Sequence, residues 1–165
     1  MRVSEKIANL RTGVGVDAHK FSVDSNEPCN LAGLSWPEAK RLEGHSDGDA
    51  AVHALCDAVL SACGLGDVGE VFGIDKPEWK GATGTAMVKH LRQLIDSKSI
   101  KINNVSLQII GNAPKISKRR DEAQKLLSEA LGAPVTIGAT TTDTMGFTGR
   151  GEGVFVIANA LVQLP

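Results

Sequence analysis

The chain has 165 residues, of which 42% are apolar and 22% are charged, and its net charge is −1. Because a chain of this length buries roughly 70% of its unfolded surface, we expect residues 1–165 to form a single domain that needs neither disulfides nor a structural metal. Lysine and arginine are dispersed, and the basic cluster at 118–120 is followed directly by Asp121 and Glu122. This pattern excludes a broad basic face and argues against a nucleic-acid partner.

The sequence carries no sign of a membrane or secretory segment. No apolar run reaches the ~18–20 residues that a membrane span needs, and the start, MRVSEKIANL, lacks a secretory apolar core. The cysteines Cys29, Cys56 and Cys63 form no CxxC pair, and a sparse, odd set is typical of reduced thiols. We therefore expect no membrane partner and a cytoplasmic location, with the bacterial cytosol the best fit.

The first predicted element is a strand over residues 12–16, followed by Asp17 and His19. Alternate side chains of a strand share a face, so these two would point the same way, about 7 Å apart at the backbone. That arrangement suits a metal ion, and it is equally typical of a strand that ends in a polar loop.

Residues 24–43 are predicted to form a loop with a short hairpin, and a helix follows. Ser46 is the predicted N-cap, and Asp49 three residues later completes a capping-box pattern. The apolar stripe of the helix is Val52, Leu55, Val59 and Leu60, and the stop signals are Gly64 and Gly66.

Further helices and strands alternate along the rest of the chain. We expect a loop at 66–80, helices at 83–97 and 117–131, and strands at 100–110, from 135 and at 154–164. The last strand is almost wholly apolar, which predicts burial on both faces. The fold class is therefore α/β, an α+β sandwich of one mixed β-sheet and one layer of helices.

A possible metal site combines the first strand with the helix after it. Asp49, His53 and Asp57 follow a helical i, i+4, i+8 spacing, which is also typical of a solvated polar stripe. Together with Asp17 and His19, His53 would complete three N/O ligands, the set of an open catalytic zinc site. The remaining acids would then orient the imidazoles. The sequence alone does not show that the two segments meet.

A second constellation lies between the last two strands. Hydroxyl and acid side chains occupy 140–143, and glycines at 149, 151 and 153 surround Arg150. Glycine-rich backbone and an arginine can hold phosphate. A tight hairpin between the last two strands explains the glycines equally well, and neither a Walker loop nor a dinucleotide fingerprint is present.

Two short turns are weaker candidates. The turn at 67–69 follows a helix and fits a solvated cap, and the turn at 111–115 has a backbone that could pair with a nucleobase edge. His90 lies in the middle of a predicted helix and receives no role.

Four strings occur together in this chain: GVGVDAHKF, GHSDGDAAVHALCDAVLSACGLGDVGEVFG, APK and ATTTDTMGFTGRGEG. In that order they resemble the 2-C-methyl-D-erythritol 2,4-cyclodiphosphate synthase family of the non-mevalonate isoprenoid pathway. The resemblance runs from about Arg11 to Val162. It implies that the 2-phosphate of 4-diphosphocytidyl-2-C-methyl-D-erythritol 2-phosphate attacks the β-phosphate of the same molecule, closes a cyclic diphosphate and expels CMP. Such a reaction needs positioning and charge stabilisation rather than a protein nucleophile.

The resemblance also implies roles for individual residues. Zinc would be held by Asp17, His19 and His53, and His45 with Thr141 would stabilise the transition state. The methylerythritol portion and its phosphate would meet Ser46, Asp67, Val68 and Gly69. The cytidine diphosphate would meet Gly111, Asn112, Ala113, Pro114 and Lys115, continuing to Ser117, and Thr140, Thr141, Thr142, Asp143, Phe147 and Arg150. A second ion, Mg²⁺ or Mn²⁺, would bridge the diphosphate and bind Asp143.

The chain departs from the family pattern at two positions. Asp143 stands where the family commonly has Glu, and Ile74 stands where an acid is frequent. The shorter Asp143 carboxylate would shift the second ion or bind it through water. The acidic contact that Ile74 cannot make would either pass to Asp75 or be lost.

The resemblance implies a homotrimer in which neighbouring subunits share each active site. Two other functions remain open, a zinc-dependent phosphohydrolase that uses a metal-activated water and a non-catalytic trimer that binds a diphosphate. Binding of isoprenoid diphosphates in the central channel of such a trimer is a further possibility that the sequence leaves open.

Overall fold

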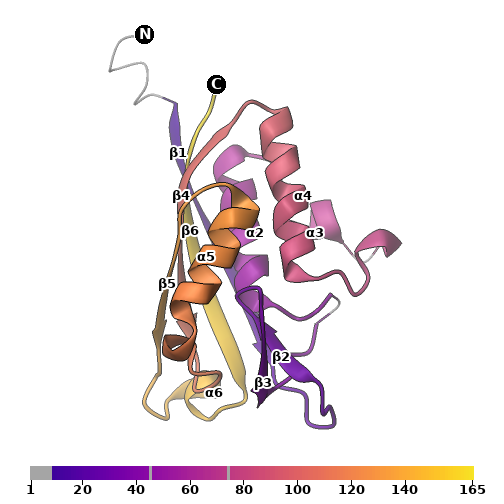
Figure 1. The fold of residues 1–165 in the computed structure, drawn as a ribbon, viewed down its shortest axis with the longest axis vertical. Coiled ribbons are helices and arrows are strands. Elements are labelled where there is room, and N and C mark those ends of the chain that lie inside the picture. Colours follow the sequence, from indigo (N-terminus) through magenta and orange to yellow (C-terminus); the bar gives the residue numbers. More distant parts are fainter. Residues whose placement is uncertain (1–8, 45, 74) are drawn as a thin grey trace.

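The computed structural model describes residues 9–44, 46–73 and 75–165. A four-stranded mixed sheet carries the helices on one face, and a two-stranded hairpin lies beside it (Figure 1). The elements are β1 (Leu10–Lys20), β2 (Pro28–Leu31), β3 (Leu34–Lys40), α2 (Ala50–Cys63), α3 (Val68–Phe72), the 3₁₀ turn η1 (Pro77–Trp79), α4 (Gly84–Ser97), β4 (Lys101–Ile110), η2 (Ile116–Lys118), α5 (Arg120–Leu131), β5 (Val135–Thr140), α6 (Gly146–Gly149) and β6 (Gly153–Gln163). The predicted mixed α/β class is confirmed.

The strand order of the sheet is β1-β6-β4-β5. The C-terminal strand β6 is antiparallel to both β1 and β4, whereas β4 and β5 are parallel. β5 and β6 follow one another in sequence, yet β4 lies between them. The segment 141–152 therefore crosses the end of the sheet, and the hairpin that the sequence offered as an alternative is wrong.

Helix α2 packs unusually closely against β1 because β1 carries two glycines. A Cβ added at Gly13 would lie 2.1 Å from the Ala58 carbonyl oxygen, and one at Gly15 would lie 2.1 Å from that of Ala54. Only glycine permits this approach. It brings the start of α2 against the end of β1, where Asp17 and His19 lie.

The buried Asp49 carboxylate fixes the beginning of α2. Its Oδ1 accepts from the N–H groups of Ala51 and Val52, both at 3.1 Å, so Asp49 is the N-cap and the predicted cap at Ser46 is wrong. The same carboxylate accepts from Ala32 and Gly33 of the hairpin turn, at 2.9 and 2.7 Å. This second set of contacts ties the hairpin to the helix. Gly64 ends the helix in the left-handed conformation, as predicted.

Several predicted element bounds differ from the structure. The predicted loop at 66–80 contains α3 and η1, and the helix predicted from residue 117 begins at Arg120, after η2. The helix predicted at 83–97 is confirmed, with Thr83 as its N-cap. Among the described residues, no helix is both long and apolar enough to cross a bilayer.

Strand β6 is buried on one face, not on both. Val154, Val156 and the alternate residues after them are fully buried toward the helices, whereas Ile157 is 37% exposed. Val16 pairs with Ile157 and is 52% exposed, and nearby Val14 is 59% exposed. The prediction is wrong for the single chain because an apolar composition does not reveal what covers the second face. We call this second, helix-free side the open face of the sheet.

Candidate metal centre and ligand pockets

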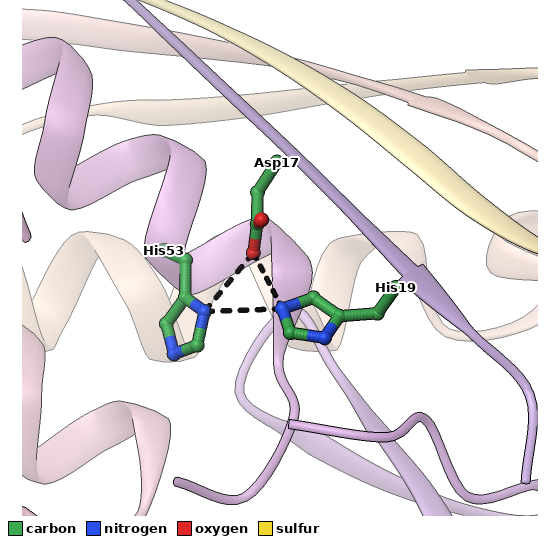
Figure 2. A group of neighbouring side chains, drawn as sticks. All are labelled: Asp17, His19 and His53. Atoms are coloured by element: carbon green, nitrogen blue, oxygen red, sulfur yellow. Dashed lines mark hydrogen bonds and ion pairs between the residues drawn. The ribbon is translucent and has the colours of Figure 1, made fainter. Parts of the chain in front are cut away.

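Asp17, His19 and His53 converge on one point (Figure 2). Asp17 and His19 lie on the face of β1 toward α2, and His53 lies near the start of α2. The Asp17 Oδ2 is 2.7 Å from His19 Nε2 and 3.0 Å from His53 Nδ1, and the two nitrogens are 3.4 Å apart. The structure thus brings together three side chains that the sequence singled out, here called the metal triad.

Each histidine of the triad is held by its second ring nitrogen. His19 Nδ1 contacts the carbonyl oxygen of Glu43, which can only accept a hydrogen bond, so Nδ1 carries the proton. His53 Nε2 lies 2.8 Å from the hydroxyl of Ser46. These contacts leave His19 Nε2 and His53 Nδ1 facing the carboxylate. Outer partners of this kind orient imidazole ligands in metal sites.

The charges of the triad depend on one another. Burial alone would raise the pKa of Asp17, but hydrogen bonds from His19 and His53 and their charges lower it overall. Burial alone would lower the pKa of His19, but the hydrogen bond and charge of Asp17 raise it overall. The carboxylate therefore stays ionised at neutral pH, as a metal ligand must.

The donor set fits a divalent metal. A tetrahedral zinc with ligands at about 2.0–2.1 Å keeps its ligand atoms about 3.3 Å apart, and the triad separations run from 2.7 to 3.4 Å. Two imidazoles and one carboxylate would occupy three coordination positions and leave one open. That is the composition of a catalytic rather than a structural zinc site.

A mostly apolar pocket of about 300 Å³ opens beside the triad, here called the aromatic pocket. Its lining residues are Ser46, His53, Val68, Gly69, Phe72, Gly73, Asp75, Trp79 and Met87. Ser46, Val68 and Gly69, predicted for one ligand portion, thus line one cavity. The Asp67 carboxylate instead caps α3, where its Oδ1 accepts from Glu70 N at 2.9 Å.

The other two acids of the predicted helical stripe are not ligands. Asp49 is fully buried as the N-cap of α2, and its pKa is raised by burial and by the negative charge of Asp47. Asp57 Oδ1 accepts from Val68 N at 2.7 Å and so holds the first residue of α3 beside the triad. Both acids position backbone segments, so the alternative of a solvated stripe is wrong for these two residues.

A second pocket, of about 170 Å³, lies at the end of β4 and β5 and is here called the cradle pocket. It is lined by Ile109, Gly111, Asn112, Ala113, Pro114, Lys115, Ile116, Ser117, Arg120, Ala139, Thr140 and Thr141. Asn112 Nδ2 donates to Gly149 O at 2.8 Å, which fixes the 111–115 turn to α6. The two sequence segments predicted to meet a cytidine diphosphate therefore share one cavity.

The segment after β5 carries the remaining candidates. Thr141 Oγ1 donates to Asp143 Oδ1 at 3.1 Å, and Asp143 adopts a positive φ of 48°. Phe147 is 41% exposed, and Arg150 pairs with Glu152 at 2.6 Å on the surface. Thr142 is tied locally, to Met145 O and to a neighbouring hydroxyl. The structure thus joins Thr141 to Asp143 and leaves Phe147 and Arg150 exposed at the surface, outside the lining of the cradle pocket.

The metal triad and the cradle pocket lie apart within one chain. β1 and β5 are the outer strands of the sheet, three interstrand spacings apart, which is about 14 Å. Among the described residues, none lines both the aromatic pocket and the cradle pocket, and no triad residue lines the cradle pocket. Two predicted residues, His45 and Ile74, lie outside the part of the chain that the structure describes.

Sequence reasoning missed several residues of these sites. Glu43 acts through its backbone carbonyl, which no side-chain motif reveals. Trp79 and Met87 line the aromatic pocket from separate elements, and the sequence indicated no site role for either. Arg120 was assigned to the basic cluster, although its place at the start of a helix behind the 111–115 turn was a signal that could have been followed.

Comparison with known proteins gives a consistent result. The family model of the YgbB family matches residues 10–163. A 2-C-methyl-D-erythritol 2,4-cyclodiphosphate synthase from Cutibacterium acnes is 51% identical over 154 residues, which cover 93% of this chain and 90% of the relative. A bifunctional IspD/IspF enzyme from Clavibacter michiganensis is also 51% identical, and the match covers 94% of this chain and 38% of that longer protein.

Solved structures agree with these relatives. IspF from Plasmodium falciparum in complex with CDP matches with a TM-score of 0.80 at 28% identity, covering 94% of this chain and 97% of that one. A CDP-bound 2C-methyl-D-erythritol-2,4-cyclodiphosphate synthase matches with a TM-score of 0.82 at 31% identity, covering 93% of this chain and all of that one (100%).

Proposed function

The chain belongs to the YgbB family, and we propose that it catalyses the reaction of the 2-C-methyl-D-erythritol 2,4-cyclodiphosphate synthases that it resembles. In that reaction an oxygen of the 2-phosphate bonds to the β-phosphorus of 4-diphosphocytidyl-2-C-methyl-D-erythritol 2-phosphate. The bridge between the α- and β-phosphates breaks, and CMP leaves. The convergence of Asp17, His19 and His53 carries this proposal, because it supplies a metal-binding set beside a ligand pocket.

The proposed metal at the triad is zinc, with Mg²⁺ or Mn²⁺ as a second ion at Asp143. Bound there, these ions would neutralise phosphate charge and polarise the phosphoryl oxygens. Ser46 and the Glu43 carbonyl keep the two imidazoles oriented, and Asp17, His19 and His53 would hold the zinc. The link between Thr141 and Asp143 supports their assignment to the same phosphate groups.

The remaining roles are those that the family resemblance implies, and the two pockets support them for Ser46, Val68, Gly69 and the turn at 111–115. Ser46, Asp67, Val68 and Gly69 would hold the methylerythritol portion, and the turn at 111–115 would hold the cytosine. His45 and Thr141 would stabilise the transition state beside the phosphates, and Thr140, Thr142, Phe147 and Arg150 would meet the diphosphate and ribose. Fixing both reacting phosphates in this way removes an entropic barrier that can amount to ~7–11 kcal/mol.

We further propose a homotrimer in which the metal triad of one subunit meets the cradle pocket of the next. The separation of about 14 Å between β1 and β5 supports a site divided between chains. The exposed Val14, Val16 and Ile157 of the open face support its burial against neighbouring subunits.

The free thiols of all three cysteines agree with the expected reducing cytosol.

A ³¹P NMR time course with the cytidyl substrate and Mg²⁺, with and without a zinc chelator, tests the function. We expect coupled cyclic-diphosphate signals together with equimolar CMP, and their loss on chelation. Release of orthophosphate would instead establish a phosphohydrolase. Tight binding without turnover would establish the non-catalytic diphosphate-binding trimer.

A further inference from the structure

Arg119 lies at the junction between one wall of the cradle pocket and helix α5. Its backbone N–H donates to Ile116 O at 3.1 Å and closes η2, and its carbonyl oxygen accepts from Ala123 N at 3.0 Å in the first turn of α5. Ile116 and Ser117 of η2 line the cradle pocket, whereas Arg119 is not among the described residues that line it. Any effect of Arg119 on a ligand there must therefore act through the position of η2.

The side chain of Arg119 reaches from this junction to the β2–β3 hairpin. Its Nη1 donates to the carbonyl oxygen of Ser35 at 2.7 Å, and its guanidinium carbon lies 5.1 Å from the centre of the Trp36 ring. A guanidinium at such a distance over an indole is attracted to the ring face. Arg119 and Ser35 are 84 positions apart in the sequence, so these contacts join two separate parts of the fold.

An ion pair with Glu122 fixes the direction of the guanidinium. Nε and Nη2 of Arg119 donate to the two carboxylate oxygens of Glu122, each at 2.7 Å. The two side chains are 34% and 54% exposed, so the ion pair alone contributes little to stability. It occupies the forked edge of the guanidinium and leaves Nη1 to Ser35. The ion pair thus aims the side chain at the hairpin.

The hairpin is a firm support for these contacts. Trp36 is fully buried, and its Nε1 donates to Leu31 O at 2.9 Å. The turn of the hairpin is held by the carboxylate of Asp49, the N-cap of α2. Because α2 also carries a metal ligand, Arg119 fixes the wall of the cradle pocket relative to the helix of the metal triad.

Other side chains hold this wall at only a few points. Asn112 Nδ2 ties the beginning of the turn to Gly149 O, and Ile116 is buried in the core. Among the described residues, the side chains of 113–118 form no hydrogen bond or ion pair with another element. The polar link at the far end of the segment is therefore the one that Arg119 makes with the hairpin.

We propose that Arg119 is a positioning residue that holds η2 against the hairpin and so keeps the cradle pocket in the shape that binds the nucleotide portion of the substrate. This role rests on the proposed function, which places that portion in the pocket. Without the clamp, η2 can shift, and a displacement of about 1 Å is enough to weaken a binding site strongly. The metal triad should keep its geometry, because Asp49 still ties the hairpin to α2.

Two matched variants, Arg119→Gln and Arg92→Gln, test the proposal on the assembled protein. Arg92 is 31% exposed, pairs with Asp96 on its own helix α4 and donates to Leu131 O at 3.4 Å, so its contacts are of the same kinds. It lines neither the aromatic pocket nor the cradle pocket. Arg119→Lys is the conservative variant, because it keeps the charge but lacks the planar fork.

For each variant, steady-state kinetics with the cytidyl substrate, metal analysis and urea denaturation are compared. In Arg119→Gln we expect KM to rise about tenfold, with kcat and zinc content unchanged. Arg119→Lys should show a smaller rise of about threefold, and it carries the comparison if Arg119→Gln does not fold. Arg92→Gln should lose a similar amount of stability and keep its KM. Equal changes in KM for the two glutamine variants would overturn the positioning role.

Titration calorimetry with CDP and CMP separates positioning from direct contact with the ligand. A displaced wall should weaken the binding of both nucleotides by the same factor. A loss confined to CDP would show that Arg119 contacts the terminal phosphate and would overturn the proposal, as would unchanged affinities.

The same measurements distinguish the role of Arg119 from the function on which it rests. Normal turnover by the unmodified protein together with an unaltered KM in Arg119→Gln would overturn the positioning role alone. If the unmodified protein bound neither nucleotide and released no CMP, the proposed function itself would be contradicted.

Discussion

The metal triad and the cradle pocket are built in different ways. Asp17, His19 and His53 lie on a long strand and a long helix, and both histidines have outer partners. The cradle pocket is formed by turns at the end of β4 and β5, where Asp143 and Thr144 adopt positive φ values of 48° and 72°. In the proposed function, the rigid centre would hold the reacting phosphates and the loop-built site would hold the part of the substrate that leaves as CMP.

The largest expected effect comes from removing a triad ligand. His53→Ala should lose bound zinc and slow CMP release by about a thousandfold, because the metal contributes several kcal/mol to charge stabilisation. Metal analysis and the rate of CMP release measure the two effects together. His90→Ala removes an exposed imidazole outside the triad and should keep its zinc. Full turnover in His53→Ala would contradict the ligand assignment.

The second-largest effect is expected from removing Asp49, the N-cap of the helix that carries His53. Asp49→Ala removes the N-cap of α2 and leaves the Ala32 and Gly33 N–H groups without their acceptor. We expect the free energy of unfolding to fall by about 3 kcal/mol, as measured by urea denaturation. Thr83→Ala, which removes the exposed cap of α4, should cost only about 1 kcal/mol. Equal losses in the two variants would show that Asp49 acts as an ordinary cap.

Removing an outer partner of the triad should weaken the metal without destroying the site. Ser46→Ala deletes the hydroxyl beside His53 Nε2, and zinc affinity should fall about 10- to 100-fold in competition with a chelating dye. Ser61→Ala removes an exposed hydroxyl from the far end of the same helix and should leave zinc affinity unchanged. An unchanged affinity in Ser46→Ala would mean that His53 is oriented by packing alone.

The smallest effect should appear on the loop-built side. Asp143→Ala should raise the Mg²⁺ concentration for half-maximal activity about tenfold and leave zinc content unchanged, since the proposed sites of the two ions share no residue. Asp143→Glu should restore normal Mg²⁺ dependence, because it installs the acid common in the family. If Asp143→Ala kept the original Mg²⁺ dependence, another group would have to hold the second ion.

Local patterns predicted the triad better than they predicted its support. The two-residue period of β1 placed Asp17 and His19 on one face, and the apolar stripe of α2 placed the helix on the sheet. The segment 46–49 offers two possible caps, and only the contacts of Asp49 with the hairpin turn decide between them. Tertiary contacts of this kind leave no periodic signal in the sequence.

Local sequence patterns could not predict the order of the strands in the sheet. The neighbours of β5 and β6 depend on which edges pair after the chain has collapsed, and the glycines at 149, 151 and 153 fit a hairpin equally well. The short α3 has only five residues, too few for a helical period to appear. For the cradle pocket, the residues alone suggested a nucleobase edge at 111–115 and a phosphate near Arg150, and the family resemblance supplied the roles of the individual residues.

Strand β6 has a further consequence for the spacing of the two sites within one chain. Val156 pairs with Asp17 on one side and with Ile109 on the other, so one residue links the strand of the metal triad to the strand of the cradle pocket. β4 pairs in turn with β5, so the distance from the triad strand to the outer strand of the cradle pocket is set by three rows of backbone hydrogen bonds, which every amino acid except proline can form. Side chains on the open face can therefore change in evolution while the separation of the triad and the cradle pocket within each chain is preserved, and in the proposed trimer such changes would alter only the affinity between subunits.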